Sequence, residues 1–446
     1  MRRRSISRMR RSSRFISMLR THYINQLNKE MNGQEVTLAG WVHEVRETSN
    51  ITFLILRDKT GIVQVIGKKG VVGEDIIHSM SMPKESVVRI VGKVSANQEA
   101  KKGFEIIPIS LENLNPLSSS IPFEVTGKVP AEIDVRLNFR YIDLRRIESS
   151  AIFKIQSTIL GAFCDFLLKK DFEEIRTPSM IAEASEGGSD LFKIRYFERE
   201  AYLAQSPQLY KQLAVIGGLD RVMMVVPVFR AEKSNTVYHL TESTQMDIEM
   251  GFATSDDAIK MLEETLVHIV KQVRKRNKEE LEQLGVKLKI PKIKRVKYSD
   301  AIAALKKKGH EIDFGHDFSR DHEEGLQKLY GDSVLVRDFP ATLRAFYSMP
   351  KKDDPDLTDS YDLMYKGLEI CSGAQRIHDP EMLIKSLEKK GLNPKDFESY
   401  INAFRFGAPP HAGWSIGLER LTMKLAGVKN IREASLFPRD RNRINP

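Results

Sequence analysis

Short runs of alternating apolar and polar residues follow one another through the first quarter of the chain. Every second side chain of a strand points to the same face, so each run predicts a strand with one buried face. Residues 58–61, Asp-Lys-Thr-Gly, supply turn formers between two of these runs. The runs occupy residues 36–42, 52–57, 62–66, 87–92 and 103–107.

Five strands between residues 35 and 112 suffice for a small closed barrel, and we predict an oligonucleotide-binding fold over residues 18–114. Such barrels bind single-stranded nucleic acid by stacking bases on exposed aromatic side chains. Phe53 and Gln64 stand where a ring could stack and an amide could read a base edge. The alternation alone favours a simpler interpretation, a core phenylalanine and a solvated glutamine.

The pattern changes after residue 114. Residues 115–149 begin with a stretch rich in proline and serine and predict a linker or hinge. Apolar residues then recur at helical spacing over 150–169, which predicts an amphipathic helix. The apolar positions of this helix are Ile152, Ile155, Ile159, Phe163 and Phe166.

Residues 150–446 predict a second domain that mixes strands and helices. Residues 172–178 read as a strand closed by a proline, and strands rich in Val and Ile then alternate with helices. Helical patterns recur at 255–285, 296–308 and 380–392. The sequence therefore predicts an α+β protein of more than one domain, which its length of 446 residues allows.

Composition narrows the setting of the protein. Hydrophobic content of 41% and charged content of 29% are typical of a soluble globular chain. We find no run near the about 18–20 apolar residues that span a membrane, and predict no membrane association. Two cysteines, Cys164 and Cys371, cannot form a disulfide framework or a zinc site by themselves. A reducing, cytoplasmic location is expected.

The positive charge of the chain is concentrated at its start. Residues 1–17 hold seven arginines and no acid, so seven of the ten net positive charges belong to this arm and +3 remains for the rest. The arm resembles an organellar transit peptide, a disordered basic tail that touches nucleic acid, or a misassigned start before Met18. No fold is predicted for it.

Arginines and carboxylates gather in two stretches of the second domain. Arg230 and Glu232 follow an apolar strand at 228–229, and Arg420 opens a predicted helix after residues 413–419. A guanidinium is always charged and grips phosphate oxygens with two parallel bonds. The sequence has no G-x-x-x-x-G-K-[ST] loop, the usual phosphate cradle. Taken singly, each arginine predicts a surface ion pair; as a set they predict a site for a nucleoside triphosphate.

Oxygen ligands for a divalent cation accompany the arginines. Glu369 and Ser372, with Glu249 of similar type, suit Mg²⁺, which takes few protein ligands beside substrate phosphates. In phosphoryl or nucleotidyl transfer the protein mainly positions groups and neutralises charge. The lack of a Ser/His/Asp signature therefore does not argue against an enzyme.

A second group of residues suits a small acidic amino acid. Gln208 and Lys211 share one face of a helical turn, and Arg376 adds a second cation. Asp247 is able to pair with an ammonium group. Two cations for a carboxylate and one acid for an amine predict a pocket for aspartate. Residues 186–189, Glu-Gly-Gly-Ser, read either as a hinged lid or as an ordinary surface loop.

These stretches resemble the class II aminoacyl-tRNA synthetases. Residues 172–178 resemble motif 1 of that class, which lies at the dimer interface; 229–249 resemble motif 2, and 417–420 resemble motif 3. Within the class, the barrel, residues 205–211 and the Gly-Gly lid resemble aspartyl-tRNA synthetases of the archaeal and eukaryotic type. The resemblance extends over residues 18–446.

The resemblance implies an activity and an architecture. It implies Mg²⁺-dependent reaction of ATP with L-aspartate to aspartyl-adenylate, then transfer to the 3′ end of tRNA(Asp). It further implies an anticodon-binding barrel, a catalytic domain built on an antiparallel sheet flanked by helices, and a homodimer.

Site residues are carried over from the family by motif. The ATP-binding positions fall at Arg230, Glu232, His239, Leu240, Glu369 and Arg420, of which Arg230, Glu232 and Arg420 are implied to be catalytic. The aspartate-binding positions fall at Glu186, Gln208, Lys211, Asp247, Ser372 and Arg376. Glu369 and Ser372 are implied to ligate Mg²⁺, and the anticodon-reading positions fall at His43, Phe53, Gln64 and Glu105.

Three positions depart from the family pattern. Residues 242–245, Glu-Ser-Thr-Gln, lack the aromatic residue that often lies under the adenine, and Tyr238 stands where a basic residue is frequent. His43 stands where strict archaeal enzymes tend to carry tryptophan. A smaller polar residue there resembles relaxed enzymes that also charge tRNA(Asn), and we expect this chain to do so.

Two alternatives remain open at this point. An asparaginyl-tRNA synthetase shares the architecture and an arginine like Arg376, but a neutral amide gains little from a second buried cation at Lys211. A non-catalytic tRNA-binding relative predicts loss of Arg230, Glu369 or Arg420, and the sequence retains all three.

Overall fold

The computed structural model describes residues 19–182 and 191–446, and divides the chain into two compact units. The first unit comprises residues 1–131 and the second comprises residues 132–446. Each unit has its own buried core and is described by itself.

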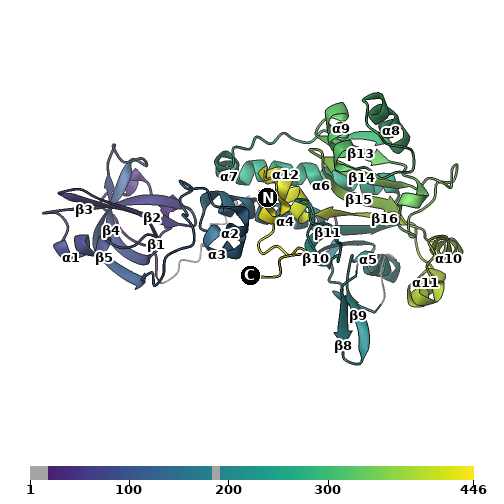
Figure 1. The fold of residues 1–446 in the computed structure, drawn as a ribbon, viewed down its shortest axis with the longest axis horizontal. Helices are drawn as coiled ribbons and strands as arrows, with labels where there is room; N and C mark the ends of the chain where they lie inside the picture. The colour runs from purple at the N-terminus through teal and green to yellow at the C-terminus, as the bar shows by residue number, and fades with distance from the viewer. Residues whose placement is uncertain (1–18, 183–190) are drawn as a thin grey trace, which may run out of the picture. The chain divides into compact units, whose positions relative to one another are not determined.

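The first unit is a closed five-stranded barrel, as the alternating runs predict (Figure 1). The strand order is β1-β2-β3-β5-β4, antiparallel except for the parallel pairing of β3 with β5. A short helix, α1 (Glu74–Met80), joins β3 to β4. The strands are β1 (Glu35–Glu47), β2 (Ile51–Asp58), β3 (Gly61–Lys68), β4 (Val87–Ala96) and β5 (Phe104–Asn115).

The barrel interior is filled by every second residue of its strands. Val36, Leu38, Leu54 and Leu56 are at most 1% exposed, and their neighbours in sequence are more exposed. Gly40 is required where β1 lies close to β2, because a Cβ there would lie 2.2 Å from the carbonyl oxygen of Arg57. This confirms the predicted oligonucleotide-binding fold.

The predicted linker at 115–149 is partly helical. Strand β5 ends at Asn115, and the second unit begins with α2 (Ile133–Asn138) and α3 (Arg140–Asp143). The guanidinium of Arg140 is buried and donates hydrogen bonds to the carbonyl oxygens of residues 433, 435 and 436. These contacts with residues near the C-terminus therefore order this stretch, and the local sequence pattern does not predict them.

The second unit is built on an eight-stranded sheet of order β12-β13-β14-β15-β16-β11-β10-β6 (Figure 1). Its pairings are antiparallel except at the two edges, where β12 with β13 and β10 with β6 are parallel. The strands are β6 (Glu173–Glu174), β10 (Arg221–Phe229), β11 (Glu242–Gly251), β12 (Lys294–Lys297), β13 (Ser333–Arg337), β14 (Ser360–Tyr365), β15 (Glu369–Gln375) and β16 (His411–Gly417).

Three helices cover one face of this sheet: α4 (Ile147–Leu168), α6 (Ser255–Arg276) and α12 (Leu418–Ala426). Their apolar faces and the strands enclose the largest core, in which Trp414 is completely buried. The predicted helix at 255–285 is two helices, because the chain leaves the α conformation at Asn277 before α7 (Lys278–Gln283).

The remaining elements lie around the edges of the sheet. A small three-stranded sheet contains β7 (Met180–Ile181), β8 (Lys193–Tyr196) and β9 (Arg199–Leu203). The helices are α5 (Gln208–Ala214), α8 (Tyr298–Lys307), α9 (Arg320–Tyr330), α10 (Pro380–Lys389), α11 (Glu398–Arg405) and α13 (Ile431–Ala434). Of the predicted strand at 172–178, only the two residues of β6 pair with the sheet.

Helix α4 is long and apolar enough to cross a membrane, a property that the sequence analysis did not identify. Length and composition alone are weak evidence, since a core helix of a soluble protein passes the same test. Ile155, Ile159, Phe163 and Leu167 are all 0% exposed and lie in the main core. Packing against the sheet accounts for this apolar face.

Candidate active site

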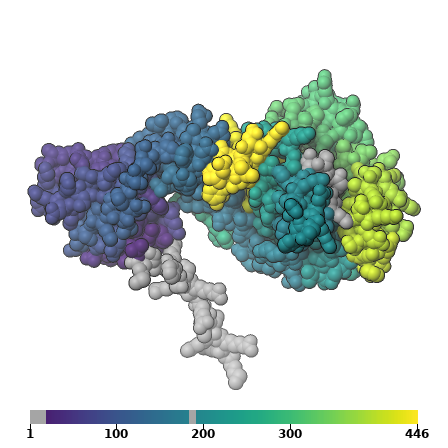
Figure 2. All heavy atoms as spheres, turned by 60° about the horizontal axis from the view of Figure 1, so that its bottom comes forward, coloured from purple at the N-terminus to yellow at the C-terminus, as the bar shows by residue number. Residues whose placement is uncertain are grey.

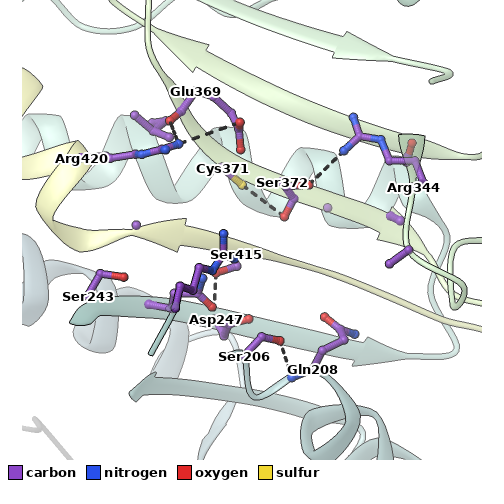
Figure 3. Close-up of a pocket in the computed structure, with 18 of the residues that line it drawn as sticks. Ser206, Gln208, Ser243, Asp247, Arg344, Glu369, Cys371, Ser372, Ser415 and Arg420 are labelled. Atoms are coloured by element: carbon purple, nitrogen blue, oxygen red, sulfur yellow. Dashed lines mark hydrogen bonds and ion pairs between the residues drawn. The ribbon is translucent and has the colours of Figure 1, made fainter. Parts of the chain in front are cut away.

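A cavity of about 460 Å³ opens within the second unit, on the face of the sheet opposite α6. Strands β11, β14, β15 and β16, helix α5, the start of α12 and the loop between β10 and β11 are among its walls (Figure 3). The sequence-predicted residues that line it are Gln208, Lys211, Arg230, Glu232, His239, Leu240, Asp247, Glu369, Ser372, Arg376 and Arg420. Glu186 lies outside the described residues.

Strand register brings the floor of this cavity together. Asp247 of β11 pairs with Ser415 of β16, Ser415 pairs with Ser372 of β15, and Ser372 pairs with Asp362 of β14. Directly opposed residues point to the same face of a sheet. Four polar side chains from four strands therefore form a row across the sheet, although up to 168 positions separate them in sequence.

A buried ion network lies beneath one end of this row. The ammonium of Lys211 is 2.5 Å from Oδ1 of Asp247 and 3.5 Å from Oε2 of Glu249, and the Lys211 side chain is 0% exposed. The guanidinium of Arg376 donates to both oxygens of Glu249, at 2.9 and 3.2 Å. Two cations and two carboxylates thus neutralise one another where solvent cannot.

The environment shifts the pKa values of the two carboxyl groups in opposite directions. Burial raises the pKa of Asp247 and outweighs the attraction of Lys211. Burial also opposes ionisation of Glu249, but the charges of Arg376 and Lys211 prevail and lower its pKa. Glu249 is therefore the fixed anion of the network.

Glu249 does not serve as the metal ligand that its residue type suggested. Its carboxylate is completely buried and bonded to Arg376, and it does not line the cavity. Gly413 makes room for it, because a Cβ at that position would lie 2.3 Å from Oε2 of Glu249. Position on the sheet, rather than residue type, decides this role.

The opposite end of the cavity carries the predicted phosphate-binding residues. Arg420 donates from Nη1 to the carbonyl oxygen of Glu369 at 3.0 Å and lies 3.9 Å from its carboxylate. Arg230 lies 3.6 Å from Glu232. Burial, followed by the charge of Arg420, lowers the pKa of His239 and favours a neutral imidazole.

Two oxygen-bearing side chains of the cavity could hold a divalent cation. Glu369 and Ser372 both line the cavity, and Asp362 lies beside Ser372 in the polar row. Burial and the neighbouring carboxylate of Asp362 raise the pKa of Glu369 to about 7. Crowded carboxylates of this kind suit a hard cation such as Mg²⁺, which would relieve their repulsion.

Arg344 occupies this cluster in the structure and was not predicted from the sequence. Its guanidinium makes two hydrogen bonds to Asp362, at 2.5 and 3.0 Å. It makes a third to Oγ of Ser372 at 3.4 Å (Figure 3). Its charge also stacks 3.7 Å above the ring of Phe339. Asp362 was missed as well, because it lies seven residues before Glu369 in an otherwise apolar strand.

The predicted nucleic-acid-reading residues lie on the barrel. Ile55 pairs with Gln64 and Phe53 with Ile66, so Phe53 and Gln64 are diagonal neighbours on one face of β2 and β3. Both are half-buried, and Gln64 donates to Glu105 of β5 at 3.0 Å. The core position expected for Phe53 from alternation alone is wrong, because Thr52 and Leu54 take the buried places.

His43 lies elsewhere on the barrel, at a bulge of β1. Its Nδ1 is 2.9 Å from the guanidinium of Arg57, whose other nitrogen is 2.7 Å from Glu85. Burial, then the charge of Arg57, lowers the pKa of His43, so the ring is a neutral hydrogen-bonding group.

Family models match both units. Residues 132–441 match the family described as tRNA synthetases class II (D, K and N), and residues 36–114 match the OB-fold nucleic acid binding domain.

Relatives in archaea are similar over nearly the whole chain. An aspartate–tRNA(Asp/Asn) ligase of Methanocaldococcus jannaschii is 46% identical, covering 96% of this chain and 98% of its own. An aspartate–tRNA(Asp) ligase of Thermoplasma acidophilum is 44% identical, covering 95% of this chain and 99% of its own.

Solved structures share the fold. An asparaginyl-tRNA synthetase of Pyrococcus horikoshii, bound to asparaginyl-adenylate, superposes with a TM-score of 0.91 at 34% identity, covering 95% of this chain and 99% of its own. An aspartyl-tRNA synthetase of Entamoeba histolytica superposes with a TM-score of 0.86 at 36% identity, covering 95% of this chain and 92% of its own.

Proposed function

The chain belongs to the class II tRNA synthetases of the aspartate, lysine and asparagine group, and we propose that it is an aspartate–tRNA ligase. The reaction joins the α-carboxylate of L-aspartate to the α-phosphate of ATP and releases pyrophosphate. The 3′-terminal ribose of the tRNA then displaces AMP. The archaeal relatives named as aspartate–tRNA ligases support this proposal.

The observation that carries the aspartate assignment is the pair of buried cations at one end of the cavity. Arg376 uses Nε and Nη2 on Glu249, which leaves Nη1 to bind a substrate carboxylate. Lys211 contributes a second ammonium from α5. A carboxylate gains from both charges, whereas the amide of asparagine would leave an N–H₂ group facing two cations.

Gln208 and Asp247 complete the proposed amino-acid site. Gln208 lines the cavity one turn before Lys211 and is held by Gln212 at 3.1 Å. Asp247 offers carboxylate oxygens at the polar row, and the α-ammonium of the substrate would bind there. Ser372 lies between this end and the phosphate end. Glu186 is proposed to approach the same ammonium.

The opposite end of the cavity is proposed to bind ATP. Arg230 would grip the α-phosphate, and His239 and Arg420 would contact the outer phosphates, with Arg420 also stacking on the adenine. All three line the cavity, as do Glu232 and Leu240. Synthetases of this class generally use ATP with Mg²⁺. Bound by Glu369 and Ser372, the ion would neutralise phosphate charge as pyrophosphate departs.

We further propose that the barrel reads the anticodon and tolerates two tRNAs. Phe53, Gln64 and Glu105 form one polar and aromatic surface across β2, β3 and β5, suited to stacking and base-edge hydrogen bonds. His43 presents a small polar group where strict enzymes carry tryptophan. Relatives named for tRNA(Asp/Asn) are consistent with charging of tRNA(Asn) as well.

A homodimer in the cytoplasm is part of the same proposal. Motif 1 includes the exposed carboxylates of Glu173 and Glu174, and the nearby Leu168 and Met180 are more than 50% exposed. Exposed apolar residues at such a position favour a protein partner. Sedimentation should therefore give a mass of about twice the 50.9 kDa of one chain.

Replacement of Lys211 tests the substrate assignment. Lys211→Leu should reduce aspartate-dependent pyrophosphate exchange at least 100-fold and leave Mg·ATP binding within about twofold, since 2–5 kcal/mol is typical for one partner of a buried pair. Leu209→Met on the same helix, away from the cavity, is the control. Aspartate-dependent exchange at the wild-type rate in Lys211→Leu would remove Lys211 from the aspartate site and with it the observation that carries the assignment.

Side-by-side aminoacylation of purified tRNA(Asp) and tRNA(Asn) tests the two-tRNA proposal. Both should be charged with aspartate, and His43→Trp should lose tRNA(Asn) while it keeps tRNA(Asp). Charging of tRNA(Asp) alone by the unmodified protein would contradict the role of His43.

A further inference from the structure

The loop between β10 and β11 carries much of the phosphate end of the cavity but has little support of its own. Glu232, Tyr238, His239 and Leu240 line the cavity, yet residues 233–237 are exposed and form no helix or strand. Loops with few buried contacts open easily. Something outside the loop must hold it in place.

The C-terminal segment provides that support through the loop's backbone. Residues 430–441 follow helix α12 and form part of the surface of the second unit, in yellow in Figure 2. The N–H of Ile431 donates to the carbonyl oxygen of Val237 at 2.9 Å, and Arg441 donates to that of Lys233 at 3.0 Å. The N–H of Thr241 in turn donates to the carbonyl oxygen of Arg439.

Arg432 lies at the centre of these contacts. Its guanidinium donates to Oδ1 of Asn235 at 2.6 Å and to the carbonyl oxygen of Thr236 at 3.2 Å. Its Nε is 2.5 Å from Oδ2 of Asp440, and both side chains are about one-tenth exposed, at 12% and 8%. Asp440 thereby orients the planar fork toward the loop, as charge-assisted pairs do.

Apolar packing joins the same two segments. Tyr238 and Leu240 of the loop pack against Ile431 and Ala434 of α13. Ile431 also lines the cavity, so the C-terminal segment reaches the cavity wall directly.

A short path connects Arg432 to His239. Thr236 accepts from Arg432 through its carbonyl oxygen, and its hydroxyl lies 2.6 Å from Nδ1 of His239. The position of His239 relative to Arg420 therefore follows from the position of Thr236. A displacement near 1 Å is enough to weaken a catalytic arrangement strongly.

We infer that the C-terminal segment is a positioning element for the nucleotide, with Arg432 and its partner Asp440 as the pair that sets the β10–β11 loop. Binding of Mg·ATP then depends on Arg432, while binding of the amino acid does not, because Lys211, Asp247 and Arg376 touch other elements. This inference rests on the proposed function for the identity of the nucleotide.

The test compares Mg·ATP binding by calorimetry in the full chain and in Arg432→Met. The dissociation constant for Mg·ATP should rise about tenfold, the fold-change equal to about 1.4 kcal/mol. In pyrophosphate exchange the KM for ATP should rise similarly, and the KM for aspartate should stay within twofold. Amide hydrogen exchange over residues 233–241 should accelerate in the variant.

Further variants separate positioning from folding. Arg432→Lys keeps the charge beside Asp440 but loses the fork, so it should recover only part of the ATP affinity. Arg441→Met removes one exposed bond to Lys233 and should raise the KM for ATP about threefold in a folded protein. Arg443→Met is the matched control, since its guanidinium contacts Asn138 and Asp134 instead of the loop.

Each outcome decides the matter. Unchanged Mg·ATP affinity in folded Arg432→Met and Arg441→Met would overturn the inference, as would equal increases in the KM values for ATP and aspartate. If Arg432→Met fails to fold, Arg441→Met and the hydrogen exchange decide. A wild-type protein that binds Mg·ATP but shows no aspartate-dependent exchange would count against the proposed function alone.

Discussion

Two residues of the cavity, Ser243 and Arg420, bear on the proposed binding of the adenine base. Ser243 lines the cavity on β11, and Arg420 faces the same cavity from α12 (Figure 3). In the proposed complex the adenine would lie between them, with the guanidinium on one face and only a hydroxyl on the other. One half of a stacking site is therefore missing.

Ser243→Phe should restore that half. Stacking of a base on an aromatic ring contributes about 1–3 kcal/mol, so the Kd for Mg·ATP should fall by about fivefold or more. Calorimetry with Mg·ATP measures the change, and Ser243→Leu, which adds bulk without a π-face, is the matched control. Equal gains in the two variants would show that burial rather than stacking is responsible.

The shifted pKa of Glu369 makes the stability of the folded state depend on pH. Burial and Asp362 raise its pKa to about 7, well above the value in an unfolded chain. The folded state therefore retains a proton that the unfolded state releases, and the associated stability is present below about pH 4.5 and is lost as pH rises through 7.

Chemical unfolding in EDTA at pH 5, 6, 7 and 8 should reveal this linkage. The stability of the wild type relative to Glu369→Gln should decline between pH 5 and pH 8, because glutamine carries no titrating charge. Glu388→Gln, on the surface of α10, is the control and should give a flat difference. A flat profile for Glu369→Gln would mean that the carboxyl group titrates normally.

At the scale of secondary-structure elements, the pairing of β11 with β16 decides the site. Gly413 of β16 lies opposite Glu249 of β11, and the space of its missing side chain is filled by that carboxylate. A Cβ at Gly413 would also lie 2.3 Å from the carbonyl oxygen of Ile248, which is backbone and cannot move aside. The strand therefore needs glycine for close approach.

Gly413→Ala should lower the free energy of unfolding by about 1–3 kcal/mol, the usual effect of overpacking. It should also weaken aspartate binding, since Glu249 orients Arg376. Gly161→Ala is the matched control: helix α4 has open space at that position, and alanine there should stabilise by about 0.5–1 kcal/mol. Denaturant unfolding distinguishes the two directions; stabilisation by Gly413→Ala would contradict the packing argument.

Two short helices position residues at the cavity. Helix α5 places Lys211 beneath the cavity, and α13 holds the β10–β11 loop through Arg432. Neither helix is longer than seven residues, and such short helices depend on tertiary contacts for their stability. The order of the site therefore depends on the elements that pack around these helices.

For the whole molecule, the two proposed binding surfaces belong to two separate units. The cavity belongs entirely to residues 132–446, and Phe53, Gln64 and Glu105 belong to the barrel of the first unit. In the proposed reaction, activation of aspartate needs the first of these surfaces, and recognition of tRNA would use both. The two partial reactions should therefore respond differently to changes in the barrel.

Phe53→Ala in the full chain should leave pyrophosphate exchange unchanged and raise the KM for tRNA(Asp) about tenfold, through loss of about 1–3 kcal/mol of base stacking. Phe53→Tyr, which keeps the ring, should retain most of the affinity. Steady-state aminoacylation at several tRNA concentrations measures both, and a tRNA KM that is insensitive to Phe53→Ala would remove this residue from the tRNA-binding surface.

The sequence by itself determined the barrel and the class of the second unit, and it singled out eleven of the residues that line the cavity. The alternation of apolar and polar residues depends only on neighbours along the chain, so strands β1 to β5 could be predicted from local sequence. Arg230, Glu369 and Arg420 stand in stretches whose residue types and order resemble one family. The family matches over residues 132–441 and 36–114 bear out that resemblance.

Only the tertiary structure decided which polar groups meet. Strand register aligned Asp247, Ser372 and Asp362 in one row across the sheet. It also paired Glu249 with Arg376 instead of a metal and left Phe53 half-buried outside the barrel core. The contacts of Arg344 and Arg432 likewise join segments that are distant in sequence. Such pairings arise from long-range packing. A shift of one residue in register exchanges the buried and exposed faces of a strand, so the local sequence pattern does not determine which residues meet.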